Sequence, residues 1–200
     1  MRDDLRSAGA SGDGNSELTG RASAHMNCQA EEEHVTPTDD IPVSWDERTV
    51  LTTMLDYARD TVHAKCAGIT EENARRAFLP TSPLMTIAGL VSHLRWVEYW
   101  WFEAVLLGQP DEHPATEDEP DREMSIALGM PIADLLTDYR ATCARYRDLA
   151  GALDLDTESR GGLKKPVTLR WILFHLIEET ARHNGHLDIL REIADGTTGT

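Results

Sequence analysis

The chain has 200 residues and a formal net charge of −16 at pH 7, from 35 acidic and 19 basic side chains. This length suits one domain with a sizeable core, and the negative charge argues against nucleic acid and anionic membrane surfaces as partners. No apolar run reaches the roughly 18 residues of a membrane span, and the first residues lack the hydrophobic block of a secretory signal. The three cysteines lack the spacing of a disulfide framework or a cysteine zinc site. We therefore expect a cytoplasmic protein.

The first part of the chain, residues 1–42, is rich in Gly, Ser, Asp, Glu and Thr and nearly free of large apolar side chains. Such a composition cannot bury enough apolar surface to offset the entropy of ordering, so it predicts a disordered N-terminal arm. His25, Cys28 and His34 lie in this arm, and in a structureless context chance explains their grouping better than a metal site does. Residues 43–200 are predicted to form a single domain.

Helical periodicity begins at Val43, and a first helix is predicted for residues 45–65. Ser44 is the expected N-cap, and Glu47, three residues later, would complete a capping box. The expected inward stripe of this helix consists of Val50, Met54, Tyr57, Ala58 and Thr61. A short helical turn capped by Thr70 is expected to follow.

Three further helices are predicted from the same periodicity. One starts after Thr86 and ends at Gly108, the next begins at Pro131, and the last runs from about Thr168 to Ala194. The acidic segment between the first two, "DEHPATEDEPDRE", is interpreted as a solvated loop. No alternating strand pattern is found, so the sequence predicts an all-α fold, a four-helix bundle.

Charged and ionisable side chains interrupt two of the predicted apolar stripes. On the last helix, Glu179 and His183 lie four residues apart on the stripe formed by Ile172, Leu176, Leu187 and Leu190. On the second helix, His93 lies on the stripe formed by Leu90, Val97, Trp100, Trp101 and Ala104. Burying such groups is costly unless they are paired or bound to something.

If the two helices face each other, His93, Glu179 and His183 converge in the bundle interior. Two nitrogens and a carboxylate are a normal ligand set for a catalytic zinc with water as the remaining ligand, and they also suit nickel or iron. Two simpler interpretations stay open. His93 can be a core histidine bonded to a backbone carbonyl, and Glu179 and His183 can be an ordinary i,i+4 pair.

The segments "GLVSHLRWVEYWWFEAVLLG", "TLRWILFHLIEETARHNGHLDILRE" and "DGTTG" resemble the DinB-like superfamily of metal-binding four-helix bundles, in particular its actinobacterial mini-circle protein branch. The resemblance extends from about Trp45 to Gly199. It implies a DinB-like bundle whose metal ligands are His93, Glu179 and His183. The superfamily also contains the mycothiol-dependent maleylpyruvate isomerases and related thiol transferases, and the isomerases are similar to this chain in having Glu at the position of Glu179.

The resemblance implies a metal-dependent thiol transferase that uses mycothiol or a similar low-molecular-weight thiol and transfers it to a small-molecule electrophile. His186 is the candidate catalytic residue, placed at the mouth of the site to hold substrate or move a proton. His175 is expected at the core edge, and Arg182 and Arg191 are expected to pair with Glu178 or Asp188. A non-catalytic metal-binding or stress-related protein and a metal-dependent hydrolase remain alternatives, and the chain is expected to be a monomer or a homodimer.

Overall fold

Helices make up the regular structure of the part of the chain that the computed structural model describes, residues 37 and 39–198. They are α1 (Glu47–Cys66), α2 (Glu71–Arg75), α3 (Ile87–Tyr99), the π-helical segment η1 (Trp100–Leu106), α4 (Arg122–Ala127), α5 (Ile132–Ala152) and α6 (Leu169–Asp195). Within these residues the only β-type contact is an isolated bridge between Glu158 and Thr168. The all-α prediction is confirmed, whereas the predicted arm over residues 1–42, with His25, Cys28 and His34, lies almost entirely outside the described residues.

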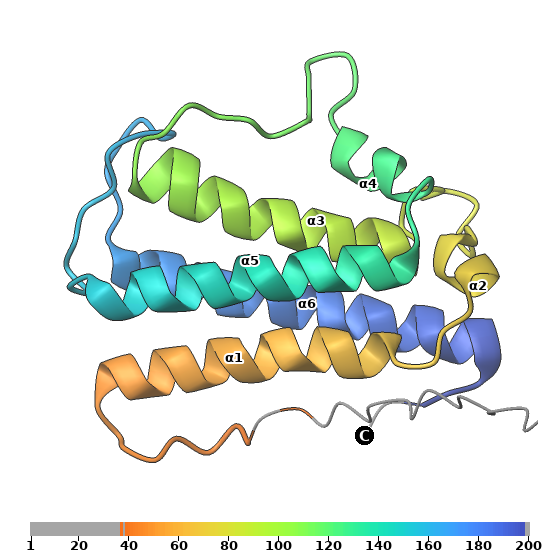
Figure 1. Cartoon of the computed structure of the whole chain (residues 1–200), viewed down its shortest axis with the longest axis horizontal. Coiled ribbons are helices and arrows are strands. Elements are labelled where there is room, and N and C mark those ends of the chain that lie inside the picture. The colour runs from red at the N-terminus through yellow and green to blue at the C-terminus, as the bar shows by residue number, and fades with distance from the viewer. Residues whose placement is uncertain (1–36, 38, 199–200) are drawn as a thin grey trace, which may run out of the picture. The chain divides into compact units, whose positions relative to one another are not determined.

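Four long helices, α1, α3, α5 and α6, lie side by side as a bundle (Figure 1). Helix α6 packs against α1 and α3, and α5 packs against the same two helices. Helices α1 and α3 therefore face each other across the bundle. The short helices α2 and α4 lie at the end of the bundle where α3 begins (Figure 1). None of the described helices is long and apolar enough to cross a membrane.

The helix starts follow from their capping residues. Thr70, Thr86 and Thr168 each accept a hydrogen bond from the backbone N–H three residues further on. The cap at Thr70 is as predicted, and Thr86 and Thr168 stand at the predicted starts of α3 and α6. The predicted cap of α1, Ser44, is wrong. The N-cap is Asp46, whose carboxylate accepts the backbone N–H of Thr49 at 3.0 Å. The carboxylate is the stronger acceptor, and its negative charge lies at the positive end of the helix dipole.

The predicted inward stripe of α1 is also wrong, by about one residue. Four of its members are only partly buried: Val50, Met54, Tyr57 and Thr61. The apolar residues of α1 that are buried are Leu55, Ala58, Val62 and Cys66. Arg59 is buried on the same side, because its guanidinium donates to the Glu98 carboxylate of α3 at 2.7 and 2.6 Å. Hydrophobic periodicity places a charged residue outside and so misses this orientation.

The predicted second helix changes its winding at Trp100 and continues as η1. Leu107 N donates to Phe102 O at 3.0 Å, which is the wider hydrogen-bonding step of a π-helix. The Val105 carbonyl lies in the last turn of η1, where carbonyls have no intrahelical partner, and it accepts the N–H of Gly161 at 3.0 Å. Glycine is needed at 161, because a Cβ there would lie 2.7 Å from Ala104 O. The connection between α5 and α6 is therefore hydrogen-bonded directly to η1.

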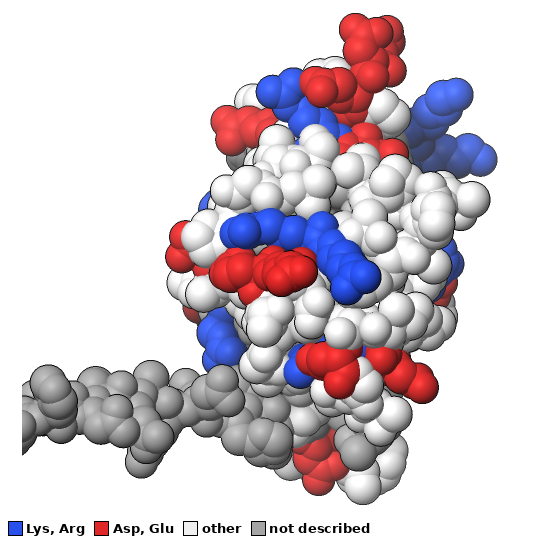
Figure 2. All heavy atoms as spheres, turned by 90° about the vertical axis from the view of Figure 1, so that its right-hand side faces the viewer, with Lys and Arg blue, Asp and Glu red and all other residues white. Residues whose placement is uncertain are grey.

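Many charged side chains on the described surface form ion pairs, whereas several acidic ones, such as Glu117 and Asp118, form none with other described residues. Figure 2 shows the bundle end that carries α2, where basic side chains lie against acidic ones and do not form a separate patch. Ion pairs of the described residues include Lys65 with Asp188 at 2.6 Å and Arg75 with Glu71 at 2.7 Å. Pairs of this exposed kind each contribute up to about 1 kcal/mol to stability.

Candidate metal centre

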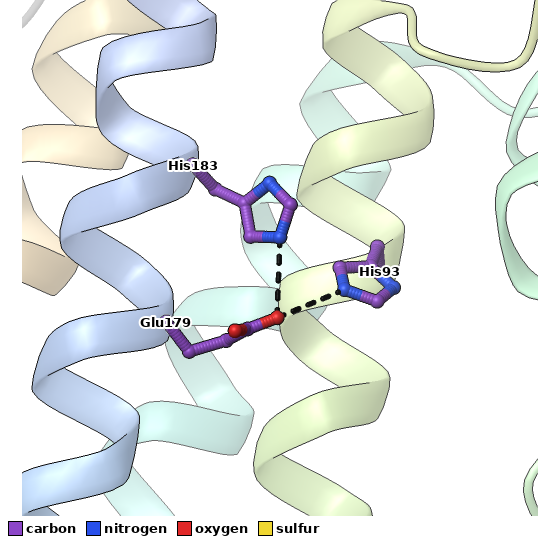
Figure 3. Close-up of side chains that lie close together, drawn as sticks. All are labelled: His93, Glu179 and His183. Atoms are coloured by element: carbon purple, nitrogen blue, oxygen red, sulfur yellow. Dashed lines mark hydrogen bonds and ion pairs between the residues drawn. The ribbon is translucent and has the colours of Figure 1, made fainter. Parts of the chain in front are cut away.

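Helices α3 and α6 bring His93, Glu179 and His183 together (Figure 3). Glu179 and His183 lie one turn apart on α6, and His183 Nε2 is 3.2 Å from Glu179 Oε1. His93 reaches the same carboxylate oxygen from α3, with Nε2 at 3.5 Å. One donor atom from each of the three side chains lies within 4.8 Å of the others.

The geometry of the three side chains fits a divalent metal. Ligands that are each about 2.1 Å from a tetrahedral ion lie roughly 3.4 Å from one another. The contacts of 3.2 and 3.5 Å to Glu179 agree with that spacing. Two imidazole nitrogens and one carboxylate oxygen suit zinc, and equally nickel or iron.

Partial burial and mutual contact shift the pKa values of Glu179 and His183 toward the forms that bind a metal. Burial alone would raise the pKa of Glu179, but the His183 charge and the hydrogen bonds with His93 and His183 outweigh it, so this pKa is lowered. Burial, together with the nearby His93, lowers the pKa of His183. Near neutral pH the site therefore offers a carboxylate at 179 and a neutral imidazole at 183, which are the metal-binding forms.

The second ring nitrogen of each histidine faces a further side chain. His93 Nδ1 lies 3.1 Å from Oε1 of Glu123, and His183 Nδ1 lies 3.2 Å from Nδ1 of His186. In both rings Nε2 is the atom turned toward Glu179. His186, predicted to face the mouth of the site, thus contacts a proposed ligand and is partly buried.

Glu123 is the site residue that the sequence analysis missed. It belongs to the segment interpreted as a solvated loop, and most of that segment is indeed exposed, but Glu123 is buried at the start of α4. Helix α4 has only six residues, too few for hydrophobic periodicity to indicate which side faces the core. A glutamate at the end of a charge run gives no other signal of burial.

The remaining singled-out residues of α6 lie away from the three ligands or are already paired. His175 stacks on Trp171 at 5.0 Å between ring centroids and meets Trp101 edge-on at 4.6 Å. Arg182 forms an exposed ion pair with Glu178, as expected. Arg191 departs from expectation: it is buried, donates to Lys65 O at 2.6 Å and pairs with Asp195 in place of Asp188.

The described cysteines are unsuited to act as nucleophiles. Cys66 and Cys143 are both buried free thiols. Burial raises the pKa of the Cys66 thiol to about 12, and burial likewise raises the pKa of Cys143. The reactive thiolate fraction of either residue is therefore very small near neutral pH.

Comparison with known protein families finds a match, and the matched residues include every residue of the candidate centre. The family model for mycothiol-S-transferases matches residues 50–196, a range that includes His93, Glu123, Glu179, His183 and His186. A search of curated proteins found no match. Because the family match covers most of the chain, the chain belongs to the mycothiol-S-transferase family, a DinB-like family.

Proposed function

We propose that the protein is a metal-dependent S-transferase that transfers mycothiol, or a similar low-molecular-weight thiol, to a small electrophile. The observation that carries the proposal is the convergence of His93 Nε2, His183 Nε2 and Glu179 Oε1 in a member of the mycothiol-S-transferase family. These three residues would hold the metal, with zinc as the expected ion.

The chemistry follows from the donor set. A divalent metal, when bound, lowers the pKa of a coordinating thiol, so that the thiolate is available near neutral pH. His93 and His183 would hold the ion through their Nε2 atoms, and Glu179 would contribute a negative charge. His186 holds the Nδ1 side of the His183 ring, and we assign it to positioning that ring.

In the overall transfer, a sulfur–carbon bond forms as the bond to the leaving group breaks. The leaving group departs with the bonding electrons, and the thiol proton passes to solvent. The thiol comes from solution, since the described cysteines are buried and protonated.

The test measures transfer with and without the external thiol. The purified protein is loaded with zinc, nickel or iron in turn, its metal content is determined, and conjugation of a bimane halide is followed with and without mycothiol. We expect conjugation above the uncatalysed rate only when both the metal and mycothiol are present.

Two results would contradict the proposal in different ways. Turnover of an ester or amide substrate in thiol-free buffer, with no thiol conjugation, would indicate a metal-dependent hydrolase. A protein that binds metal and gives no turnover with any of these substrates would be assigned to non-catalytic metal binding. His183→Ala serves as the control without a complete ligand set.

A further inference from the structure

We propose that Glu123 is a positioning residue for His93: its carboxylate accepts the Nδ1–H of the ring and thereby directs the Nε2 lone pair at the metal. This inference rests on the proposed metal site. It is carried by the contact of 3.1 Å between Glu123 Oε1 and His93 Nδ1, on the ring edge opposite Nε2.

The burial of Glu123 requires a compensating partner. Its side chain is 5 % exposed, Oε1 faces His93, and Oε2 has no hydrogen-bond partner among the described residues. A buried carboxylate with so few partners is costly. A cation held at Nε2 polarises the imidazole and strengthens the Nδ1–H bond to the carboxylate, so the buried charge is compensated through the ring.

The contact also selects the tautomer of His93. A ring protonated at Nδ1 donates to Glu123 and leaves the Nε2 lone pair for the metal. Without an ion, the other tautomer can donate Nε2–H to Glu179, 3.5 Å away, so Glu123 has to favour the metal-binding form against this contact. The opposite tautomer would place the Nδ1 lone pair against the Glu123 carboxylate, which is repulsive. The metal-binding tautomer is therefore the one that Glu123 stabilises.

The backbone holds Glu123 in register with His93. Ser92, the residue before His93, donates its hydroxyl to the Glu123 carbonyl oxygen at 2.6 Å, and this contact is buried. One residue of α3 thus anchors the α4 backbone while the next residue meets the α4 side chain. His183 differs, because its Nδ1 meets the imidazole of His186 and no carboxylate.

The first experiment measures metal affinity, with Co²⁺ as the probe and calorimetry as the readout. Glu123→Ala removes both the acceptor and the charge, so we expect about 10–100-fold weaker binding. Glu123→Gln keeps an acceptor oxygen and should fall between Glu123→Ala and the wild type.

The matched control is Glu103→Gln. Glu103 is a buried carboxylate of η1 that contacts Arg145 and Tyr146, away from the three ligands. We expect wild-type Co²⁺ affinity for this variant. Circular dichroism checks that each variant is folded. If Glu123→Ala does not fold, the Co²⁺ affinity of Glu123→Gln is compared with that of the wild type instead.

The second experiment separates positioning from a general structural role. In the Co²⁺-loaded wild type, the ring N–H protons of the two ligating histidines should give two paramagnetically shifted signals that vanish in D₂O. Glu123→Ala should broaden or remove one signal and leave the other, and Glu123→Gln should restore it.

The possible outcomes are distinct. Unchanged affinity and two intact signals in Glu123→Ala would overturn the assignment. Equal losses in Glu123→Ala and Glu103→Gln would assign Glu123 to stability alone. A wild type that binds no Co²⁺ would overturn the metal site and this inference together, whereas metal binding without thiol transfer would leave the inference standing and reject the proposed function.

Discussion

His183 contacts three other residues of the candidate centre. It shares Glu179 Oε1 with His93, its ring lies 4.9 Å from that of His93, and its Nδ1 meets His186. Its removal would leave one imidazole and one carboxylate, on different helices. A site with two protein ligands of this kind would bind a divalent metal far more weakly than one with three.

We therefore predict that His183→Ala abolishes both metal retention through gel filtration and thiol transfer. Cys66→Ser and Cys143→Ser should retain transfer, because the proposed nucleophile is an external thiol and both cysteines are buried. Metal content and bimane conjugation are measured on the same samples. Loss of transfer in a folded, metal-loaded Cys66→Ser protein would show that the nucleophile was wrongly assigned.

His63 makes the stability of the protein sensitive to acid. Burial, together with the charge of Arg140, lowers the pKa of His63 to about 4, against about 6.5 for an unperturbed histidine. Between these two values the unfolded chain binds more protons at this residue than the folded chain does. The free energy of unfolding is therefore highest above pH 6.5 and falls as the pH drops from 6.5 toward 4.

For the pH dependence we predict that lowering the pH from 7.5 to 5 costs about 2 kcal/mol through His63 alone. His63→Phe keeps a ring beside Tyr139, with which His63 stacks, and removes the titration. Urea unfolding of both proteins at the two pH values gives the difference directly. Identical losses in wild type and variant would contradict the assignment.

At the scale of elements, a buried ion pair joins α1 to α3 across the bundle. Arg59 donates to both oxygens of Glu98, and both side chains are almost fully buried. Burial opposes the charge on Arg59, but the Glu98 carboxylate outweighs it, so the pKa of Arg59 is raised. A pair of this kind is costly to break from one side only, because without Glu98 the buried Arg59 keeps a single anionic partner, Asp56 at 3.2 Å, and its charge is poorly compensated.

For this pair we predict that Glu98→Ala lowers the free energy of unfolding by about 3–5 kcal/mol. The double variant Arg59→Met, Glu98→Leu removes both charges and conserves volume, so it should be more stable than Glu98→Ala. Chemical denaturation of the three proteins checks the order. A double variant less stable than the single one would show that the pair itself contributes net stability.

Two glycines should respond in opposite directions to the same substitution. Gly161→Ala places a Cβ 2.7 Å from Ala104 O, so it should destabilise the bundle by about 1–3 kcal/mol. Gly185 lies within α6 with open space around the corresponding position, so Gly185→Ala should raise stability by up to about 1 kcal/mol. Thermal unfolding of the two variants tests both statements, and a neutral Gly161→Ala would show that η1 yields to the added methyl group.

The sequence predicts the elements whose signals are local. The cap at Thr70 and the starts of α3, α5 and α6 beside Thr86, Pro131 and Thr168 follow from capping, proline and periodicity rules. The winding change at Trp100 is not predicted, because the apolar stripe continues through it to Ala104 and indicates a single helix. The pairing of His93 with Glu179 follows from two interrupted apolar stripes, whereas Glu123 carries no local mark and is placed by a tertiary contact with Ser92.

At the scale of the whole molecule, the chain has a net charge of −16, and its first residues contain few large apolar side chains. The family match begins at residue 50, and α1 begins at Glu47. Every helix of the described bundle therefore lies after the segment that is poor in apolar residues. The packing that holds the bundle together is built from residues beyond that segment.

We predict that deleting residues 1–40 changes the melting temperature by no more than a degree or two, since that composition supplies no core-forming side chains. The shortened chain keeps Asp46, the cap of α1. Calorimetric scans of the full and shortened proteins give the comparison. A large drop would show that the first residues pack on the bundle.

The proposed ligands His93 on α3 and Glu179 on α6 are 86 residues apart along the chain, and this separation determines when in folding a metal could act. Glu179 and His183 can meet in a nascent helix, but His93 joins them only after α3 and α6 have docked. An ion bound by all three therefore belongs to the native state and not to the transition state for folding. We expect metal to slow unfolding while leaving the refolding rate almost unchanged, which stopped-flow measurements with and without a chelator would detect.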